Sequence, residues 1–437
     1  MKQSLLVLTA ITALLSGALS SAAEEPMVRT QILSIRAQMA FIPAATYSLQ
    51  TIEGKTLSEL RPQVTYRIRT SAQGLILSSS AAGPSTLPAS LVLESGEPSG
   101  TLTIEKVPYG VGWWWESAED RAYRGALEVH RKPDGNLQVI SILPLDDYLC
   151  GVVPSEIGTT SPTEALKAQA VAARSETLAM LKKTNHPGEN FDLCADVHCQ
   201  AYSGATKETP QTNSAVRTTR GLVLSYQGEP VGAYYASNCG GHSENVENVW
   251  SSRSPAVPYW SGHYDSETPY PLDLRREEDI RRWISMKPQC YCNPDNPGLP
   301  AWSKKYFRWE RQVTAEELEA FVAKTRDIGR IVRMVPRGRG VSGRLLEMEF
   351  VGERGSLVVG PELAIRQVFS PPLYSAAFVV DVEGSAETPE AFLIRGAGWG
   401  HGVGMCQTGA IAMAAQGKSF EDILAHYYRE TKLTRLY

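Results

Sequence analysis

Three ionisable side chains within residues 143–178 have types suited to acid/base chemistry: Glu156, Lys167 and Arg174. Glu156 lies in a stretch rich in Pro, Gly, Ser and Thr, which predicts a loop, and an alanine-rich helix is expected to follow it. Lys167 and Arg174 are seven residues apart, nearly two helical turns, so we expect them on one helix face. An apolar pocket raises the pKa of a carboxyl group and lets it act as a general acid near neutral pH. The pattern therefore indicates acid/base chemistry on a polar substrate, which the two cations would clamp or whose transition-state charge they would stabilise.

A structural interpretation of the same residues stays open. Glu156 can cap the helix that follows or pair with Arg174, and Lys167 can belong to a solvated helix face. Asp146 and Asp147 are the nearest other carboxylates, at the point where a strand is expected to pass into a loop, and we interpret them as structural.

A short run of cysteine and histidine has metal-ligand spacing. Cys194, His198 and Cys199 lie within six residues, and His186 stands eight residues upstream as a possible fourth ligand. Two thiolates and two imidazoles would form a closed tetrahedral zinc site, which is structural rather than catalytic. A disulfide between Cys194 and Cys199, or from either one to Cys239, is the alternative in an oxidising compartment.

Residues 395–407, RGAGWGHGVGMCQ, contain more glycine than a simple turn requires. Such a loop allows close approach of a ligand to the backbone and would present His401 and Gln407 at a cleft; the alternative is a tight bend packed through glycine. Gln200 is a further side chain suited to hydrogen bonding with sugars. A further hypothesis is that His401 and Cys406 form a thiol–imidazole pair, which would make the protein a cysteine hydrolase. Full activity of a Cys406→Ala variant would exclude this hypothesis.

The elements that position these residues divide the chain into a β-rich part and a mixed part. Residues 24–122 alternate short β-branched and aromatic runs with turn signals, and a hairpin is predicted about residues 133–135. A helix is predicted over 162–182, with Ser161 as N-cap and Glu164 as the acid of a capping box.

Later segments follow the same mixed pattern. A second capping box, Thr314 with Glu317, predicts a helix over 314–324, and two short helices are expected within 407–428. Residues 254–305 are rich in Pro, Trp, Tyr and charge and are expected to form an irregular excursion. The predicted class is α+β, with a mixed β-rich core and a few helices.

Composition limits the functional classes. Residues 1–23 combine an N-terminal lysine, an apolar run and small residues, which predicts a secretory signal peptide and a periplasmic or cell-envelope location. The net charge of −4 offers no basic surface for nucleic acid, and no later segment of the 437 residues is apolar enough to predict a membrane span. Seven cysteines are an odd number, so at least one thiol is expected to be free, metal-bound or intermolecular.

Taken together, five stretches resemble one family, the stage II sporulation protein D family, also called the amidase-enhancer or SpoIID domain. The matching stretches are LDDYLCGVVPSEI, EALKAQAVAARSETLAM, FDLCADVHCQAYSGA, AYYASNCGGHSENVENVW and RGAGWGHGVGMCQTGAIAMAAQGKSFEDILAHYY. They occur in the family's order over residues 123–437, so the resemblance implies a SpoIID-type domain there, with an inserted subdomain at about 254–305.

The resemblance implies a lytic transglycosylase that cleaves peptidoglycan glycan strands from which a cell-wall amidase has removed the stem peptides. Glu156 falls on the family's catalytic acid, and Lys167 and Arg174 coincide with its active-site cations. Five further residues fall on motif positions expected to line the cleft and bind substrate: Gln200, Tyr202, His242, His401 and Gln407. The resemblance also favours zinc at His186, Cys194, His198 and Cys199, with no cofactor required for the chemistry.

The departures from the family pattern leave the acid in place. Ile157 replaces a common Met, and Cys239 and Cys406 stand where Ser or Thr is common, which makes a disulfide between the two glycine loops conceivable. A glycoside hydrolase commonly uses two carboxylates, whereas one acid suffices if the sugar's own 6-hydroxyl attacks the anomeric carbon. A non-catalytic peptidoglycan-binding module that activates an amidase is the alternative function.

Overall fold

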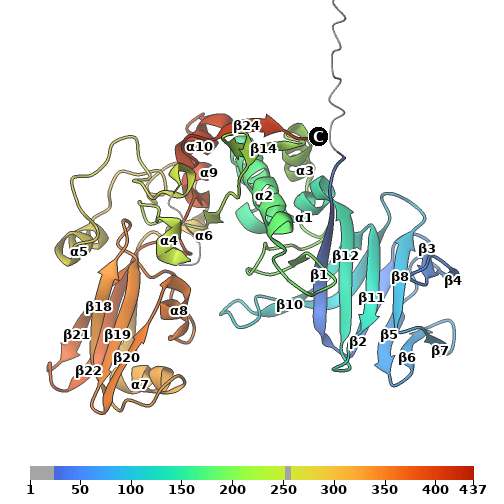
Figure 1. Ribbon diagram of the computed structural model, residues 1–437, viewed down its shortest axis with the longest axis horizontal. Helices are drawn as coiled ribbons and strands as arrows, with labels where there is room; N and C mark the ends of the chain where they lie inside the picture. The colour runs from blue at the N-terminus through green and yellow to red at the C-terminus, as the bar shows by residue number, and fades with distance from the viewer. Residues whose placement is uncertain (1–23, 251–256) are drawn as a thin grey trace, which may run out of the picture.

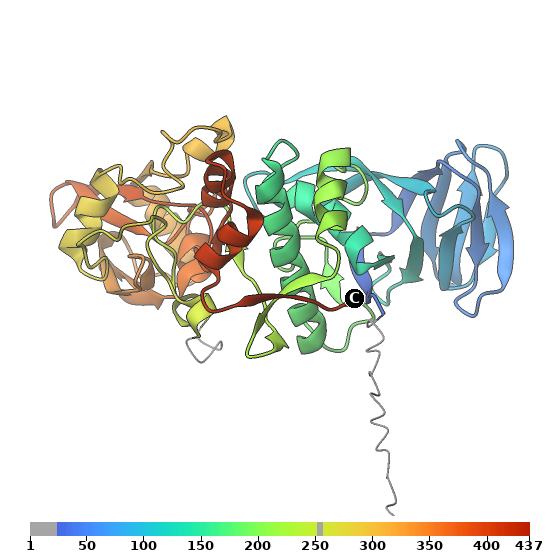
Figure 2. The same ribbon diagram turned by 90° about the horizontal axis from the view of Figure 1, so that it is seen from above.

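The protein is described by a computed structural model that places residues 24–250 and 257–437. The predicted signal peptide, 1–23, lies outside the described residues. Three bodies follow one another along an elongated molecule: a β-rich N-terminal part, a central group of helices, and a second mixed lobe (Figures 1 and 2). The predicted α+β class is confirmed. The domain limits drawn from the sequence stay predictions.

Two sheets that share one hydrophobic core make up the N-terminal part. One has the strand order β13-β1-β12-β11-β8-β3-β4 and the other β10-β9-β2-β5-β6-β7. Alternating burial, as in β2, fits strands with one face in the core, and buried residues of both sheets, such as Phe41 and Leu93, belong to the same cluster. The strands are β1 Met27–Arg36, β2 Gln38–Pro43, β3 Tyr47–Gln50, β4 Thr56–Leu60, β5 Tyr66–Ser71, β6 Gly74–Ser79, β7 Ser85–Leu87, β8 Ser90–Ser95, β9 Thr101–Tyr109, β10 Ser117–Arg124, β11 Ala126–Arg131, β12 Leu137–Pro144 and β13 Leu193–Cys194.

The central body is built around the long helix α2, which contacts four other helices and the strand β14. Its elements are α1 Leu145–Ile157, α2 Thr163–Lys183, α3 Pro210–Thr218, β14 Leu222–Tyr226, β15 Glu229–Pro230, β16 Tyr235–Ala236, β23 Met405–Cys406, α9 Gln407–Ala415, α10 Phe420–Tyr427 and β24 Lys432–Arg435. The C-terminal strand β24 returns to pair with β14, so the end of the chain lies beside α2 and α3 (Figure 1). Apart from β13, the central body therefore combines residues 145–236 with residues 405–437.

The second lobe has its own hydrophobic core, which includes Phe350, Phe378 and Phe392. Two three-stranded sheets, β17-β22-β21 and β18-β19-β20, form it together with helices α7 and α8. Its elements are β17 Trp309–Thr314, α7 Ala315–Ala323, β18 Ile331–Arg339, β19 Leu345–Gly352, β20 Gly355–Val359, α8 Glu362–Gln367, β21 Phe378–Gly384 and β22 Pro389–Gly396. Residues 257–305, expected to be irregular, have little regular structure: α5 Glu277–Ser285, α6 Ala301–Lys304 and a short 3-10 turn; the short helix α4, Val246–Val249, precedes them.

Local predictions met different outcomes. The hairpin is confirmed, since β11 pairs with β12 and Gly135 has a φ of +83° in the turn. The capping box of α7 is confirmed, with the Glu317 N–H donating to Thr314 Oγ1 at 3.1 Å. The capping box predicted for the long helix is wrong: α2 has Pro162 at its N-cap without a side-chain bond, and the Ser161 hydroxyl donates to the carbonyl oxygen of Ile157 instead.

The two glycine-rich loops lie directly against each other. Asn238 and Trp399 exchange backbone hydrogen bonds of 3.1 and 2.8 Å. Gly398 has a φ of +83°, and a Cβ there would lie 2.6 Å from the carbonyl oxygen of Asn238. Glycine is therefore required by both backbone conformation and close approach. Among the described residues, no helix has the length and apolar character needed to cross a bilayer.

Candidate active site

Glu156 lies in the last turn of helix α1, one residue before its end at Ile157. The predicted loop is therefore wrong at this position. Pro154 indicated a loop because it removes one helical hydrogen bond, yet the helix continues through it because its apolar residues, including Leu149 and Val153, are fully buried. Gly158, with a φ of +85°, then ends the helix. A helix fixes the direction of the carboxylate more firmly than a loop would.

The Glu156 carboxyl is half-buried and receives three hydrogen bonds. The backbone N–H of Ala201 donates to Oε1 at 2.7 Å, and the side chains of Gln407 and Tyr235 donate as well. Burial is the largest influence on this carboxyl and raises its pKa from 4.5 to about 7, although all three donors act in the opposite direction. Near neutral pH the group is therefore divided between acid and carboxylate.

Gln200 fixes the orientation of Tyr235. Its buried amide is fully hydrogen-bonded: the oxygen accepts from Thr177 at 2.8 Å and from Tyr148 at 3.2 Å, while the nitrogen donates to Ala173 O at 3.3 Å and to the Tyr235 hydroxyl oxygen at 3.0 Å. Because Tyr235 accepts from Gln200, its own proton is left to donate to Glu156. Gln200 was predicted to bind substrate, but it is 1% exposed and its amide is fully occupied within the protein, so this assignment is corrected: Gln200 positions Tyr235.

Gln407 and His401, both from the second glycine loop, lie beside Tyr235. Strands β16 and β23 pair in parallel, with Tyr235 opposite Met405, so Gln407 begins α9 close to Tyr235. The Gln407 amide also donates to Gln169 Oε1 at 3.1 Å. His401 accepts from the N–H of Val403 at 3.0 Å and hydrogen-bonds to the backbone of Tyr235.

His401 stays neutral in this position. Burial, followed by the charges of Arg344 and Arg366, lowers its pKa to about 3. The His401 ring is therefore an uncharged hydrogen-bonding partner of the Tyr235 backbone. A neutral imidazole of this kind does not serve as a second acid beside Glu156.

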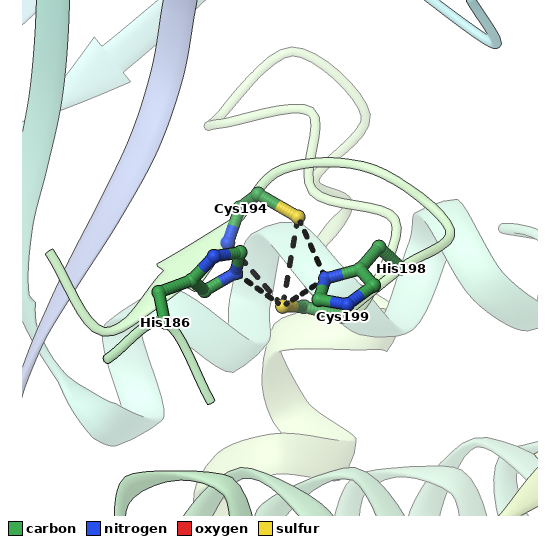
Figure 3. Close-up of side chains that lie close together, drawn as sticks. All are labelled: His186, Cys194, His198 and Cys199. Atoms are coloured by element: carbon green, nitrogen blue, oxygen red, sulfur yellow. Dashed lines mark hydrogen bonds between the residues drawn. The ribbon is translucent and has the colours of Figure 1, made fainter. Parts of the chain in front are cut away.

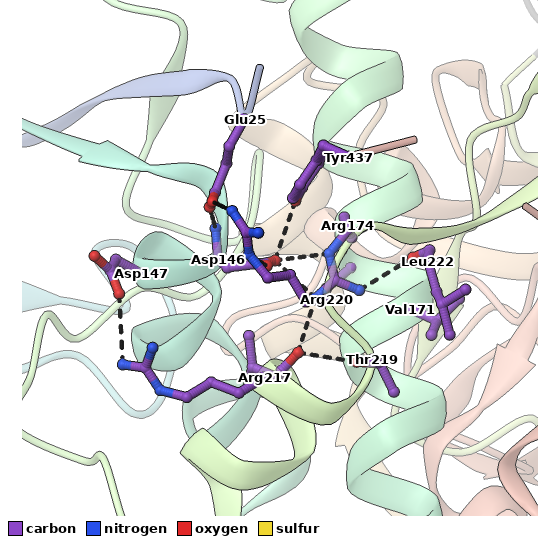
Figure 4. Close-up of polar contacts among 12 residues, drawn as sticks. Glu25, Asp146, Asp147, Val171, Arg174, Arg217, Thr219, Arg220, Leu222 and Tyr437 are labelled. Atoms are coloured by element: carbon purple, nitrogen blue, oxygen red, sulfur yellow. Dashed lines mark hydrogen bonds and ion pairs between the residues drawn. The ribbon is translucent and has the colours of Figure 1, made fainter. Parts of the chain in front are cut away.

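Arg174 does not face Glu156, and this expectation is corrected. Its fully buried guanidinium pairs with Asp146, with Nη2 2.7 Å from Oδ1, and donates to the carbonyl oxygens of Leu222 and Val216 (Figure 4). The Tyr437 hydroxyl donates to the same Asp146 oxygen at 3.1 Å. Arg174 thus joins α1, α3 and β14, and the structural interpretation of Asp146 holds.

Lys167 also has a local partner. Its Nζ lies 2.7 Å from Oε1 of Glu164 on the preceding turn and 5.7 Å from the centre of the Phe420 ring. Among the described residues, neither Lys167 nor Arg174 belongs to the groups that shift the pKa of Glu156. Within the described residues both cations have other partners, because α2 directs Lys167 to α10 and Arg174 to α1.

Two other predicted substrate-binding residues lie in the interior. Tyr202 is 2% exposed and packs against Tyr123 and Tyr148 in the core. His242 is 7% exposed, hydrogen-bonds to Ser243 O at 2.7 Å and has its pKa lowered to about 3 by burial. The structure does not bring either of them to Glu156, so their assignment to the substrate site is corrected.

The predicted Cys/His cluster forms as expected (Figure 3). The ligand atoms of His186, Cys194, His198 and Cys199 all lie within 4.8 Å of one another. The two sulfurs are 3.5 Å apart, His186 Nε2 is 3.2 Å from the Cys199 sulfur, and His198 Nδ1 is 3.5 Å from it. These four residues form a group able to hold a metal ion.

All seven cysteines are described, and each is a free thiol, so the disulfides considered above are not formed. Cys406 accepts hydrogen bonds from the N–H groups of Cys239 and Gly409, while His401 has other partners. The thiol–imidazole pair of a cysteine hydrolase is therefore not formed within the described residues.

Neither Tyr235 nor the Ala201 N–H could be recognised from the sequence as a partner of the acid. Tyr235 lies beside two similar residues in AYYAS, and a backbone donor has no sequence signature. The one available hint was that Ala201 directly follows Gln200, a residue already singled out.

Comparison with known proteins agrees with the resemblance. Residues 133–226 match the family model described as stage II sporulation protein, SpoIID, and residues 244–404 match a domain of unknown function, DUF8618. Stage II sporulation protein D of Bacillus subtilis is 28% identical over 316 residues, 68% of this chain and 76% of that protein.

Two further relatives have the same identity but are covered less fully. An uncharacterized protein of Brachyspira hyodysenteriae is 28% identical over 291 residues, 66% of each chain. The amidase enhancer of Bacillus subtilis is 28% identical over 302 residues, which are 65% of this chain but only 40% of that protein. The matched region begins before Glu156 and, in the first model, contains both the acid and Ala201. The chain is therefore similar to the stage II sporulation protein D family over about two thirds of its length, and its residues 133–226 match the SpoIID family model.

Proposed function

We propose that this protein is a lytic transglycosylase that cleaves peptidoglycan glycan strands and leaves 1,6-anhydro-muramic ends. The observation that supports this most is a single half-buried carboxyl, Glu156, whose pKa of about 7 suits both loss and gain of a proton near neutral pH. Among the described groups that shift this pKa there is no second carboxylate. A hydrolase of the common type would require one.

In the first step, protonated Glu156 donates its proton to the glycosidic oxygen, and the bond to the anomeric carbon breaks. In the second step, the resulting carboxylate removes the proton from the 6-hydroxyl of the same sugar, whose oxygen bonds to the anomeric carbon. No water is consumed, and Glu156 ends protonated as it began. The donors from Ala201, Gln407 and Tyr235 stabilise the carboxylate that exists between the two steps.

The similarity to the SpoIID family supports the substrate and setting that we propose. We propose glycan strands denuded by a cell-wall amidase as substrate, in cell-wall remodelling at division or in a sporulation-like septal process, and a periplasmic or cell-envelope location. The name of the amidase enhancer of Bacillus subtilis supports an amidase partner for that protein, and here it remains a proposal.

We also propose structural zinc at the Cys194 cluster. With Zn–S near 2.3 Å and Zn–N near 2.0–2.1 Å, tetrahedral ligand atoms lie about 3.3–3.8 Å apart. The two contacts of 3.5 Å lie within that range, and the 3.2 Å from His186 Nε2 to the Cys199 sulfur is just below it. The cluster precedes Gln200 and Ala201 directly, so it would hold the segment that contacts Glu156 and Tyr235.

Mass spectrometry of the products tests the proposed activity. Purified protein incubated with amidase-denuded strands is expected to yield anhydro-muramic ends. Reducing ends would instead identify a hydrolase and direct attention to Glu176, whose charge acts on Tyr235. If the protein sediments with the strands without cutting them, the non-catalytic amidase-enhancer module is correct.

Tyr235→Phe is expected to lower kcat by about tenfold or more and to move the alkaline limb of kcat/KM to higher pH. The hydroxyl bond to Glu156 favours the carboxylate, so its loss raises the pKa of the acid from about 7. The measurement is the pH–rate profile of both proteins. Tyr202→Phe is the matched control, because the Tyr202 hydroxyl contacts only Ser141, at 3.4 Å, among the described residues. An unmoved limb in Tyr235→Phe would contradict the assigned hydrogen bond.

Cys199→Ser is expected to lose one zinc per chain and more than about 3 kcal/mol of unfolding free energy, since loss of a metal is among the largest single-residue effects. Metal content by mass spectrometry and urea unfolding measure both. Cys150→Ser, at a buried thiol outside the cluster, controls for the loss of a sulfur atom. An unchanged metal content would remove the zinc proposal.

A further inference from the structure

A second group of sulfur and oxygen atoms converges in the interior, away from the Cys194 cluster. Cys239 comes from the first glycine loop, Cys406 from the end of β23, and Asp265 and Cys292 from the segment 257–305. All four residues are buried, between 1% and 4% exposed. Their ligand atoms all lie within 4.8 Å of one another.

The distances fit one tetrahedral ion. The sulfurs of Cys239 and Cys292 are 3.6 Å apart, and the Cys239 sulfur is 3.4 Å from Asp265 Oδ2. Zn–S bonds of 2.3 Å and a Zn–O bond of 2.0–2.2 Å place such atoms about 3.5–3.8 Å apart. The distance between the sulfurs lies within this range, and the distance from sulfur to oxygen is just below it. The Cys406 sulfur accepts two backbone N–H bonds, from Cys239 at 3.2 Å and from Gly409 at 3.4 Å. Such contacts are typical of the outer shell that orients the ligands of a metal.

Asp265 is a buried carboxylate without a strong cation. Among the described residues it pairs only with His426, 3.4 Å from Oδ1, and accepts from the Tyr427 hydroxyl at 2.7 Å on the same oxygen. Oδ2 accepts from the Cys239 thiol at 3.4 Å and from the backbone N–H of Cys292 at 3.2 Å, so it lies beside the sulfurs. A buried carboxylate placed among thiols is a suitable ligand for a divalent ion between Oδ2 and the sulfurs.

Arg308 provides a complementary observation. Its guanidinium donates to backbone carbonyl oxygens, including that of Gly240 at 3.0 Å, and within the described parts of the chain it makes no ion pair with a carboxylate. Its charge lies within electrostatic reach of Cys239 and Cys292. Three thiolates and a carboxylate around a divalent ion carry two net negative charges, which this arginine would partly balance.

We propose that Cys239, Cys292, Cys406 and Asp265 bind a structural zinc ion. The ion would join the first glycine loop, the segment 257–305 and the start of α9. Cys406 directly precedes Gln407, the donor to Glu156, so the ion would hold that amide in place without contacting the reacting groups. Binding releases one proton from each of the three thiols.

The test uses the full chain carrying Cys194→Ser and Cys199→Ser, so that the first cluster no longer binds metal. One zinc per chain is expected to remain, and replacement by Co²⁺ is expected to give the thiolate-to-metal absorption of three Co–S bonds. Absence of bound metal, or absorption without thiolate character, overturns the proposal. This measurement changes nothing at the proposed ligands, so it does not depend on whether their variants fold.

Two further variants in the same background assign the ligands. Cys239→Ser is expected to lose the zinc, whereas Cys290→Ser is expected to keep it, although its sulfur is only 3.9 Å from that of Cys292. Zinc retained in Cys239→Ser, or lost in Cys290→Ser, contradicts the ligand set. A peptide in which a disulfide joins any two of Cys239, Cys292 and Cys406, found after alkylation without reductant, also overturns it.

Discussion

Glu156→Gln is expected to reduce glycan cleavage by about 10³-fold or more, because an amide cannot donate the proton that a general acid transfers. The substitution keeps the size of the side chain and an oxygen for the Ala201 N–H. Binding to denuded strands is therefore expected to persist while anhydro-muramic ends disappear. Retained turnover in the variant would show that another group is the acid.

The same substitution is expected to stabilise the protein at alkaline pH. Below pH 4.5, Glu156 is protonated in both the folded and the unfolded state and has no pH-dependent effect. As the pH rises from 4.5 to about 7, the unfolded chain ionises first, so stability is lost across this window. Above pH 7 the full cost applies, at most about 3 kcal/mol and less where solvent reaches the carboxyl. Urea unfolding at pH 4 and pH 8 measures the difference.

Glu164→Gln is the matched control with the opposite sign. The side-chain bond from Lys167 and the N–H of Phe420 lower the pKa of Glu164 despite its partial burial. Its charge therefore stabilises the folded protein at pH 8, and the amide is expected to lose that contribution. Equal shifts in the two variants would mean that the raised pKa of Glu156 is not the cause.

Arg174→Met is expected to lower the free energy of unfolding by about 3–5 kcal/mol, the range for removing one partner of a buried ion pair. The substitution leaves Asp146, 6% exposed, without its main cation, and it also frees the carbonyl oxygens of Leu222 and Val216. Urea unfolding at neutral pH measures the loss. The double variant Arg174→Met with Asp146→Leu is expected to recover most of it, because no unpaired charge remains buried.

A nearby surface pair serves as the control for Arg174. Arg217 lies 3.7 Å from Asp147 and its side chain is 63% exposed, so Arg217→Met is expected to change stability by less than about 0.5 kcal/mol (Figure 4). If Arg174→Met unfolds like the wild type but loses turnover, the cation has the catalytic role that the family resemblance implies.

Local sequence signals predicted local structure well. The Thr314–Glu317 box opens α7, and glycine allows the turn at residue 135, because each needs only neighbouring residues. The Cys/His cluster was also predictable, since its four ligands fall within residues 186–199. Glu156 could be named as the acid candidate from its motif, but its helix was missed because Pro154 weighs against a helix locally while the burial of α1 favours it.

The sequence by itself determined the fold class, the hairpin, the α7 cap, the candidate acid and the Cys/His cluster of residues 186–199. Only the tertiary structure decided which groups meet: Tyr235 and Gln407 at Glu156, Arg174 at Asp146, and Asp265 with Cys292 at Cys406. These contacts join segments far apart in the chain, and they depend on which face of each element is buried. The hydrophobic effect decides which faces are buried, and it depends on the whole chain and has no preferred direction. The spacing of residues in the sequence therefore does not show which residues become neighbours.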